Sequence, residues 1–193
     1  IYEKTARKVV REYVNKINDP DAINGFIYRR GEAWLVNANY SKKGFGFSVG
    51  AKRVDNMSFK SDRTATGSDL SINFLPALAK QHTYSLLAFY PYATQPKGEI
   101  GYQADLTYKL KKETALGGKY GTDISINYSG DNGLDTTGLD ALYDSSRTGY
   151  TINDLSLGET YFQDFNIEIS RKLSPKLKAM VIYANQVYNK NIV

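Results

Sequence analysis

Two long stretches of the chain alternate between apolar and polar residues. Within 98–110, the even positions from Ile100 to Leu110 are mostly apolar, and the odd positions from Gly101 to Lys109 are small, polar or charged. Residues 118–130 repeat the pattern. Because successive strand residues point to opposite faces, this pattern predicts the two half-buried arms of one β-hairpin, joined by a turn at 111–117.

The length of these arms points to a membrane. Strands of soluble proteins usually have about 5–6 residues, whereas a tilted strand that crosses a bilayer needs about 9–11. Both arms meet the longer requirement, and tyrosines lie toward the ends of their apolar stripes, at positions 102, 108, 120 and 128. Such tyrosines are typical of the aromatic girdles of outer-membrane barrels, although β-propensity also explains the 16 tyrosines.

Alternating patterns elsewhere predict six further strands, at 32–40, 45–54, 70–74, 84–90, 161–173 and 177–188. The odd-numbered connections then fall at 41–44, 76–83, 111–117 and 174–176, and the even-numbered ones at 55–69, 91–97 and 131–158. The longest connections are all even-numbered. Short turns at one end and long loops at the other are typical of outer-membrane barrels. We therefore predict an all-β fold: an antiparallel up-and-down transmembrane β-barrel, or part of one, with about eight strands.

The first 31 residues are predicted as a lead-in to strands that occupy 32–193. Apolar residues within 3–17 recur at helical spacing and favour a short amphipathic helix. A strand is the alternative, because Val9, Val10 and Tyr13 also suit β structure.

Composition narrows the functional classes. The formal net charge is +5, but the lysines are spread along the chain, so no nucleic-acid partner is predicted. The absence of cysteine excludes disulfides and thiolate sites, and is compatible with an oxidising cell envelope. No cofactor and no metal site are predicted. The only histidine, His82, has no serine that the sequence singles out as its partner, so no catalytic residues are predicted.

Two groups of residues are candidates for function. The first is a polar stripe expected to face the lumen of the barrel, where it would line a channel or pair internally as a plug: Gln103, Asp105, Lys109, Lys119, Asp123, Asn127, Asp164 and Glu168. The second mixes both charges closely and is expected to form a recognition surface on a loop: Arg53, Asp55, Lys60, Asp62 and Arg63.

Long blocks within 18–190 include the unusual runs YPYATQPKGEIGYQ and LGGKYGT. In these blocks the chain resembles the C-terminal half of an uncharacterised family of outer-membrane β-barrel proteins from the Bacteroidetes. The resemblance implies a bacterial outer-membrane location and more chain on both sides. It carries over no activity, substrate or site residue.

The leading functional hypothesis is a non-enzymatic barrel that serves as a subunit or scaffold of an envelope complex, in secretion, surface assembly or uptake. The alternatives are a pore or transporter for a small solute, and a soluble β-rich module that binds carbohydrate or another ligand. The expected partners are outer-membrane lipid and either other envelope proteins or the missing part of the same chain. We expect the strands at 32–40 and 177–188 to pair with such outside chain rather than with each other.

Overall fold

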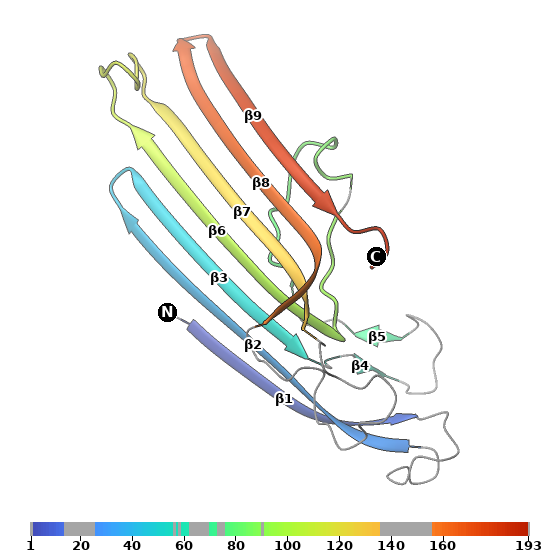
Figure 1. The fold of residues 1–193 in the computed structure, drawn as a ribbon. Helices are drawn as coiled ribbons and strands as arrows, with labels where there is room; N and C mark the ends of the chain where they lie inside the picture. The colour runs from blue at the N-terminus through green and yellow to red at the C-terminus, as the bar shows by residue number, and fades with distance from the viewer. Residues whose placement is uncertain are drawn as a thin grey trace.

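The computed structural model describes residues 2–13, 26–55, 57, 59–61, 70–72, 76–89, 91–135 and 156–192, of which 2–13, 26–31, 59–60 and 71–72 are described by their backbone alone. Seven strands form one antiparallel sheet (Figure 1). Their order across the sheet is the same as their order along the chain. They are β1 (Tyr2–Tyr13), β2 (Phe26–Lys42), β3 (Phe45–Asp55), β6 (Gly98–Leu110), β7 (Thr122–Leu134), β8 (Leu157–Ser174) and β9 (Leu177–Tyr188). A separate two-stranded sheet joins β4 (Phe59–Lys60) to β5 (Ser71–Ile72). The predicted all-β antiparallel architecture is confirmed.

Short turns gather at one end of the sheet and long connections at the other (Figure 1). The β2–β3, β6–β7 and β8–β9 pairs close at the first end, which we call the turn end. The two-residue β2–β3 turn uses Gly44, whose φ of +78° suits glycine. The connections β1–β2, β3–β6 and β7–β8 all leave the opposite end, which we call the loop end. This alternation is cleaner than the predicted one, because the structure has fewer strands.

The sheet is open. Among the described residues, β1 pairs only with β2 and β9 only with β8, so these two strands form opposite edges. Residues 32–40 do not pair with β9, as expected. Their second partner is β1, however, and not chain from outside the sequence.

The helix predicted at 3–17 is wrong. Residues Tyr2–Tyr13 form strand β1, which pairs with β2 in register from Tyr2↔Asn37 to Tyr13↔Phe26. The β-branched and aromatic residues that matched helical spacing also suit a strand, and pairing with β2 decides between the two. No helix in the described part of the chain is long and apolar enough to cross a membrane.

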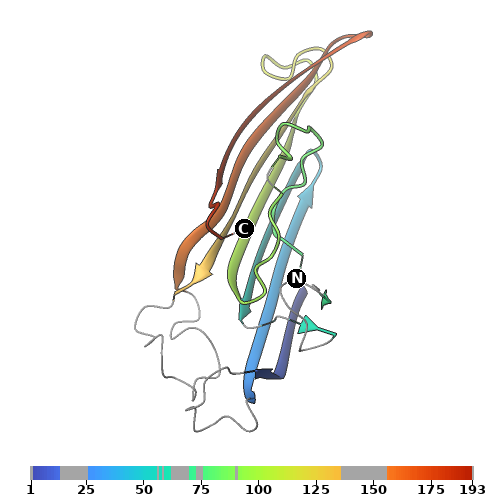
Figure 2. The same cartoon turned by 90° about the vertical axis from the view of Figure 1, so that its right-hand side faces the viewer.

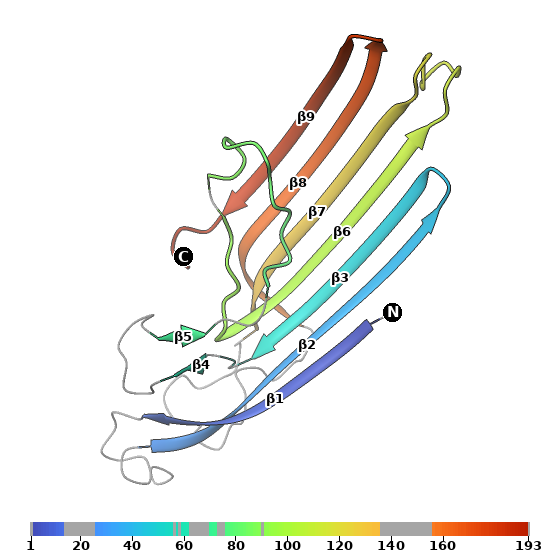
Figure 3. The ribbon, with the colours of Figure 1, turned by 180° about the vertical axis from the view of Figure 1, so that it is seen from behind.

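Two predicted strands are absent from the main sheet. Of 70–74, only Ser71–Ile72 is extended, in β5, and 73–75 lie outside the described residues. Residues 84–89 form turns, in which the Leu87 and Ala88 amides donate to the Tyr84 carbonyl at 3.0 and 3.1 Å. The predicted turn at 76–83 is therefore part of one long β3–β6 connection. Residues 76–97, which we call the covering segment, lie over one face of the sheet (Figures 2 and 3).

Burial on the two faces of the sheet is the reverse of that in an ordinary soluble protein. The covered face carries most of the buried polar side chains, including Lys52, Glu99, Asn127, Asp131, Asp164 and Asn166. The other face exposes large apolar side chains, among them Tyr40, Phe47, Val49, Tyr108, Tyr128, Ile169, Val181, Tyr183 and Val187. The few buried apolar residues include Tyr92 of the covering segment and Phe162 of β8, whose rings stack with centroids 5.2 Å apart.

Candidate functional site

Hydrogen bonds join polar side chains of three neighbouring strands across the covered face. Asp105 of β6 accepts from Gln103 at 3.0 Å and from the Asn127 side-chain amide of β7 at 2.6 Å. Asn127 in turn accepts from Asn166 of β8 at 3.1 Å. Asn166 also donates to Asp164 on its own strand, at 3.2 Å. Because period-2 alternation places all these residues on one face, the sheet itself aligns them as neighbours.

The covering segment is tied directly to this network. Lys80 Nζ donates to the Asn166 side-chain oxygen at 2.6 Å, and His82 Nε2 contacts the Asp164 carboxylate. Gln186 of β9 donates to the Leu87 carbonyl and to Asp164, both at 3.1 Å. Polar side chains of the sheet therefore hold residues 80–87 in place, and much of the donor and acceptor capacity of this face is used internally.

A buried ionic cluster ties down both ends of the covering segment. Lys52 of β3 is 1% exposed, and its Nζ lies 2.6 Å from Glu99 Oε1 and 4.0 Å from Asp131 Oδ1. The same ammonium donates to the Pro76 carbonyl at 2.9 Å and to Thr94 Oγ1 at 2.6 Å. A buried charge is tolerated only when it is paired and hydrogen-bonded. The sheet supplies the paired carboxyl groups of Lys52, and the covering segment supplies its other two hydrogen-bond acceptors.

Glu99 completes the attachment of residues 92–95. Its Oε2 accepts the Tyr92 hydroxyl hydrogen bond and the Gln95 amide hydrogen bond, the latter at 2.7 Å. Burial, and then the negative charge of Glu99, raise the pKa of Tyr92 far above its usual value, so the phenol stays protonated and donates. Gly101 provides the room for the cluster, because a Cβ there would lie 2.4 Å from Asp131 Oδ1 and 2.7 Å from Lys52 Cε.

A cavity remains between the covering segment and the sheet. Its volume is about 700 Å³, and Lys80, His82, Tyr92, Phe162 and Gln186 are among its lining residues. Lys80, His82 and Gln186 already bond to Asn166, Asp164 and the Leu87 carbonyl. The polar side chains that line the cavity therefore include ones that hold the segment on the sheet.

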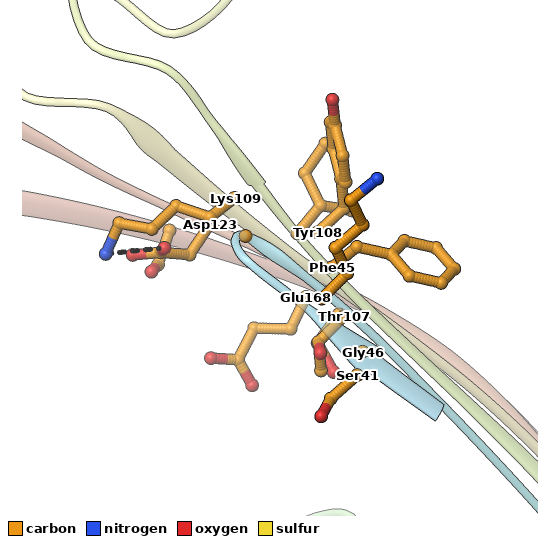
Figure 4. Close-up of a pocket in the computed structure, with 13 residues that line it drawn as sticks. Ser41, Phe45, Gly46, Thr107, Tyr108, Lys109, Asp123 and Glu168 are labelled. Atoms are coloured by element: carbon orange, nitrogen blue, oxygen red, sulfur yellow. Dashed lines mark ion pairs between the residues drawn. The ribbon is translucent and has the colours of Figure 1, made fainter. Parts of the chain in front are cut away.

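Most of the predicted polar stripe shares the covered face. Gln103, Asp105, Asn127 and Asp164 belong to the hydrogen-bonded network described above. Nearer the turn end, Lys109 and Asp123 form an exposed ion pair at 3.3 Å, beside Glu168. In Figure 4 these three side chains leave one side of the sheet, and Phe45 and Tyr108 leave the other.

Lys119 is a correction to the predicted stripe. It lies in the β6–β7 turn rather than on a strand, because β7 begins only at Thr122. Its Nζ stands over the Tyr120 ring, 5.8 Å from the centroid. The turn was predicted at 111–117, but it extends to Gly121. Gly118 and Gly121, in the added part, both have positive φ, which suits glycine.

The predicted recognition loop is wrong where the structure describes it. Arg53 and Asp55 are 3% and 6% exposed at the end of β3, and they form an ion pair at 3.1 Å. The strand extends to Asp55, so these charges belong to its buried end rather than to a loop. Lys60 lies in β4, described there by its backbone, and Asp62 and Arg63 lie outside the described residues. The predicted loop 131–158 is also shorter, because Asp131 is buried in β7 and β8 begins at Leu157.

Sequence reasoning did not predict the attachment of the covering segment, which uses Lys52, Lys80, His82, Tyr92, Thr94 and Glu99. The available signal was the alternation itself, since Lys52 and Glu99 fall on the polar parity of their strands. Their contacts with Pro76, Thr94 and Tyr92 depend on a segment that was predicted to contain a strand.

We expect Asp164→Ala to release the middle of the covering segment. The change removes the acceptor for His82, Gln186 and Asn166, and an unsatisfied buried donor costs about 1–3 kcal/mol. Limited proteolysis of the folded protein should then cut within 80–89 faster than in the wild type. Asp123→Ala is the matched control, since Asp123 is exposed and far along the sheet. Equal cleavage of both variants at 80–89 would contradict the role given to Asp164.

Comparison with known proteins assigns the chain to a family but gives no information on its activity. A family model described as "Family of unknown function (DUF6029)" matches residues 2–193. No curated protein matches the chain, and no solved structure matches it. The resemblance to an uncharacterised family is confirmed to that extent.

Proposed function

The chain belongs to the DUF6029 family, and we propose that it forms part of a bacterial outer-membrane β-barrel. In this proposal the covered polar face points into the lumen, and the exposed apolar face meets lipid. The protein acts without catalysis, as a subunit or scaffold of a cell-envelope complex of the kind found in Bacteroidetes. The observation that carries the proposal is the reversed burial of the two faces.

The exposed face fits lipid better than water. Phe47, Leu106, Ile126, Ile167 and Tyr183 lie side by side across five strands. Soluble monomers rarely expose continuous apolar patches larger than a few hundred Å², whereas barrel strands alternate apolar residues outward with polar residues inward. A soluble carbohydrate-binding module gives no reason for such a wide apolar face.

The dimensions of the apolar face also fit a bilayer. From Tyr102 to Leu110 of β6, both on the apolar face and half-buried, there are eight residue steps, or about 27 Å along the strand. A tilt of about 35–45° reduces this to roughly 20 Å, close to the ~25 Å apolar band of outer-membrane barrels. At the turn end of this band, Tyr40, Phe45 and Tyr108 form an aromatic row, with centroid separations of 6.1 and 6.5 Å. Ile100 lies beyond the other end of the band, where it is buried.

Internal pairing on the polar face favours a plugged scaffold over an open pore. The covering segment bonds to β3, β6, β8 and β9 through Lys52, Glu99, Asp164, Asn166 and Gln186. Among the described residues, His82 bonds to Asp164 and to no serine, so a Ser-His-Asp reaction has no support here. Channel conductance in planar bilayers would instead favour the alternative of a pore or transporter for a small solute.

The two open edges of the sheet are evidence that further strands pair with it. Backbone groups in lipid must be hydrogen-bonded, so an open strand edge is not tolerated there. Strands β1 and β9 therefore need further strands, from the missing part of the same chain or from a neighbouring envelope protein.

Single cysteines test the topology in intact cells, because the chain has none of its own. Lys97 and Lys112 are exposed and lie at the loop end and the turn end. A membrane-impermeant maleimide should label Lys97→Cys from outside, and Lys112→Cys only after the outer membrane is permeabilised. The protein should also need detergent for extraction. Equal labelling of both cysteines in intact cells, or extraction without detergent, would contradict the barrel.

A further inference from the structure

The positive charge of the protein is concentrated at the turn end. Residues 41–45, 109–123 and 171–178 form the tips of its three hairpins. They contain two acidic residues, Glu113 and Asp123, and ten basic ones: Lys42, Lys43, Lys109, Lys111, Lys112, Lys119, Arg171, Lys172, Lys176 and Lys178. The chain has 25 basic and 20 acidic residues in total. The rest of it therefore carries 15 basic against 18 acidic residues, so the turn end accounts for all of the net positive charge.

These cations are available to a partner. All but the half-buried Arg171 are exposed. Of these ten cations, only Lys109 forms an ion pair with another described residue, Asp123, at 3.3 Å. Lys119 and Lys172 each lie over the Tyr120 ring, at 5.8 and 5.4 Å from its centroid. The cluster is therefore not neutralised by the fold itself.

The cations lie next to the aromatic row of the apolar face. Phe45 pairs with Tyr108 in the register of β3 and β6, and Lys109 and Lys111 follow Tyr108 directly along the chain. Tyrosine favours the level of lipid headgroups, and lysine just beyond an apolar band extends to the phosphates. An anionic leaflet attracts basic residues placed at its surface, and this attraction falls off within about a Debye length.

We propose that the turn end binds the phosphate groups of anionic phospholipids in the leaflet that faces the short turns. The inference rests on the proposed barrel, and it adds a lipid class and a preferred orientation. The three hairpin tips gather at one end of the sheet (Figure 1), so their cations lie on the same side of the proposed barrel.

The test uses the chain together with the further strands that β1 and β9 require, from the same protein or from its partner. It is diluted from urea into vesicles of phosphatidylcholine alone or of phosphatidylcholine mixed with phosphatidylglycerol. Insertion is followed by protease protection as the lipid concentration is raised. We expect phosphatidylglycerol to lower the lipid concentration needed for half-insertion, and sodium chloride to remove the difference. Lys111→Gln/Lys112→Gln should raise that concentration on the order of tenfold in the mixed vesicles. Lys60→Gln/Lys97→Gln, of equal charge change in the connection at the opposite end, should behave as wild type.

The possible outcomes distinguish a failure of the proposed lipid binding from a failure of the proposed barrel. Equal insertion into both kinds of vesicle overturns the lipid preference and leaves the barrel standing. Equal weakening by the two double variants also overturns it, because net charge would then explain the effect. Insertion into neither vesicle overturns both proposals. If the Lys111→Gln/Lys112→Gln variant does not fold, the salt titration of the wild type decides.

Discussion

Leu106→Arg should impair membrane insertion far more than Thr107→Arg. Leu106 lies in the middle of the apolar face, between Phe47 of β3 and Ile126 of β7 in register. An arginine on the lipid face near the bilayer midplane costs about 2–4 kcal/mol. This corresponds to a factor of roughly 30 to 1,000 in the folding equilibrium. Urea titration of the protein in phosphatidylcholine vesicles measures the difference.

Thr107→Arg is the matched control because Thr107 is the next residue on the same strand. It lies on the covered face near the turn end, where it is exposed. An arginine there meets water rather than lipid, so insertion should change little. If both variants insert and unfold alike, the assignment of the two faces is wrong.

Lys52→Met should destabilise the fold strongly and loosen both ends of the covering segment. The variant keeps most of the side-chain volume but leaves the buried carboxylates of Glu99 and Asp131 without their cation. Breaking a buried ion pair by removing one partner costs about 3–5 kcal/mol. It also removes the donor to the Pro76 carbonyl and to Thr94. Urea unfolding gives the free energy, and limited proteolysis near 76 and 94 reports on the segment.

Two further variants make the test of the cluster specific. Lys97→Met changes an exposed lysine at the same end of the sheet and should have a small effect. Lys52→Met/Glu99→Gln should recover part of the loss, because one of the two unpaired carboxylates is replaced by a neutral amide. Wild-type stability of Lys52→Met would show that the cluster does not hold the segment.

Strands with a clear apolar and polar alternation, and the faces of their residues, could be predicted from the sequence. In β6, and in β7 as far as Tyr128, the period-2 alternation is uninterrupted, and the predicted residues share faces in the structure. A one-residue slip would reverse both faces, so such a pattern fixes which side each residue occupies. The lengthening of β7 through Asp131 and Asn132 was missed, because Asp, Asn and Gly are typical of loops.

Where two local patterns compete, only tertiary contacts decide. Val9, Val10 and Tyr13 satisfy helical spacing and β-propensity alike, and the pairing of β1 with β2 selects the strand. Residues 84–90 are mostly aromatic and aliphatic and were predicted as a strand, yet Leu86 is 80% exposed and Tyr84 begins a turn. The ionic cluster was beyond local reasoning, because Lys52 and Glu99 are brought together by the pairing of β3 with β6.

The strict strand order has a consequence for how the chain folds. Each of the hairpins β2–β3, β6–β7 and β8–β9 closes over a short turn and can form from residues that are near in sequence. Local contacts of this kind form fast, whereas the entropy lost on closing a loop grows with its length. The pairing of β3 with β6 must enclose 56–97, the longest connection in the sheet. We therefore expect the hairpins to assemble first, and the joining of β3 to β6, which also brings Lys52 to Glu99, to be a late and slow step.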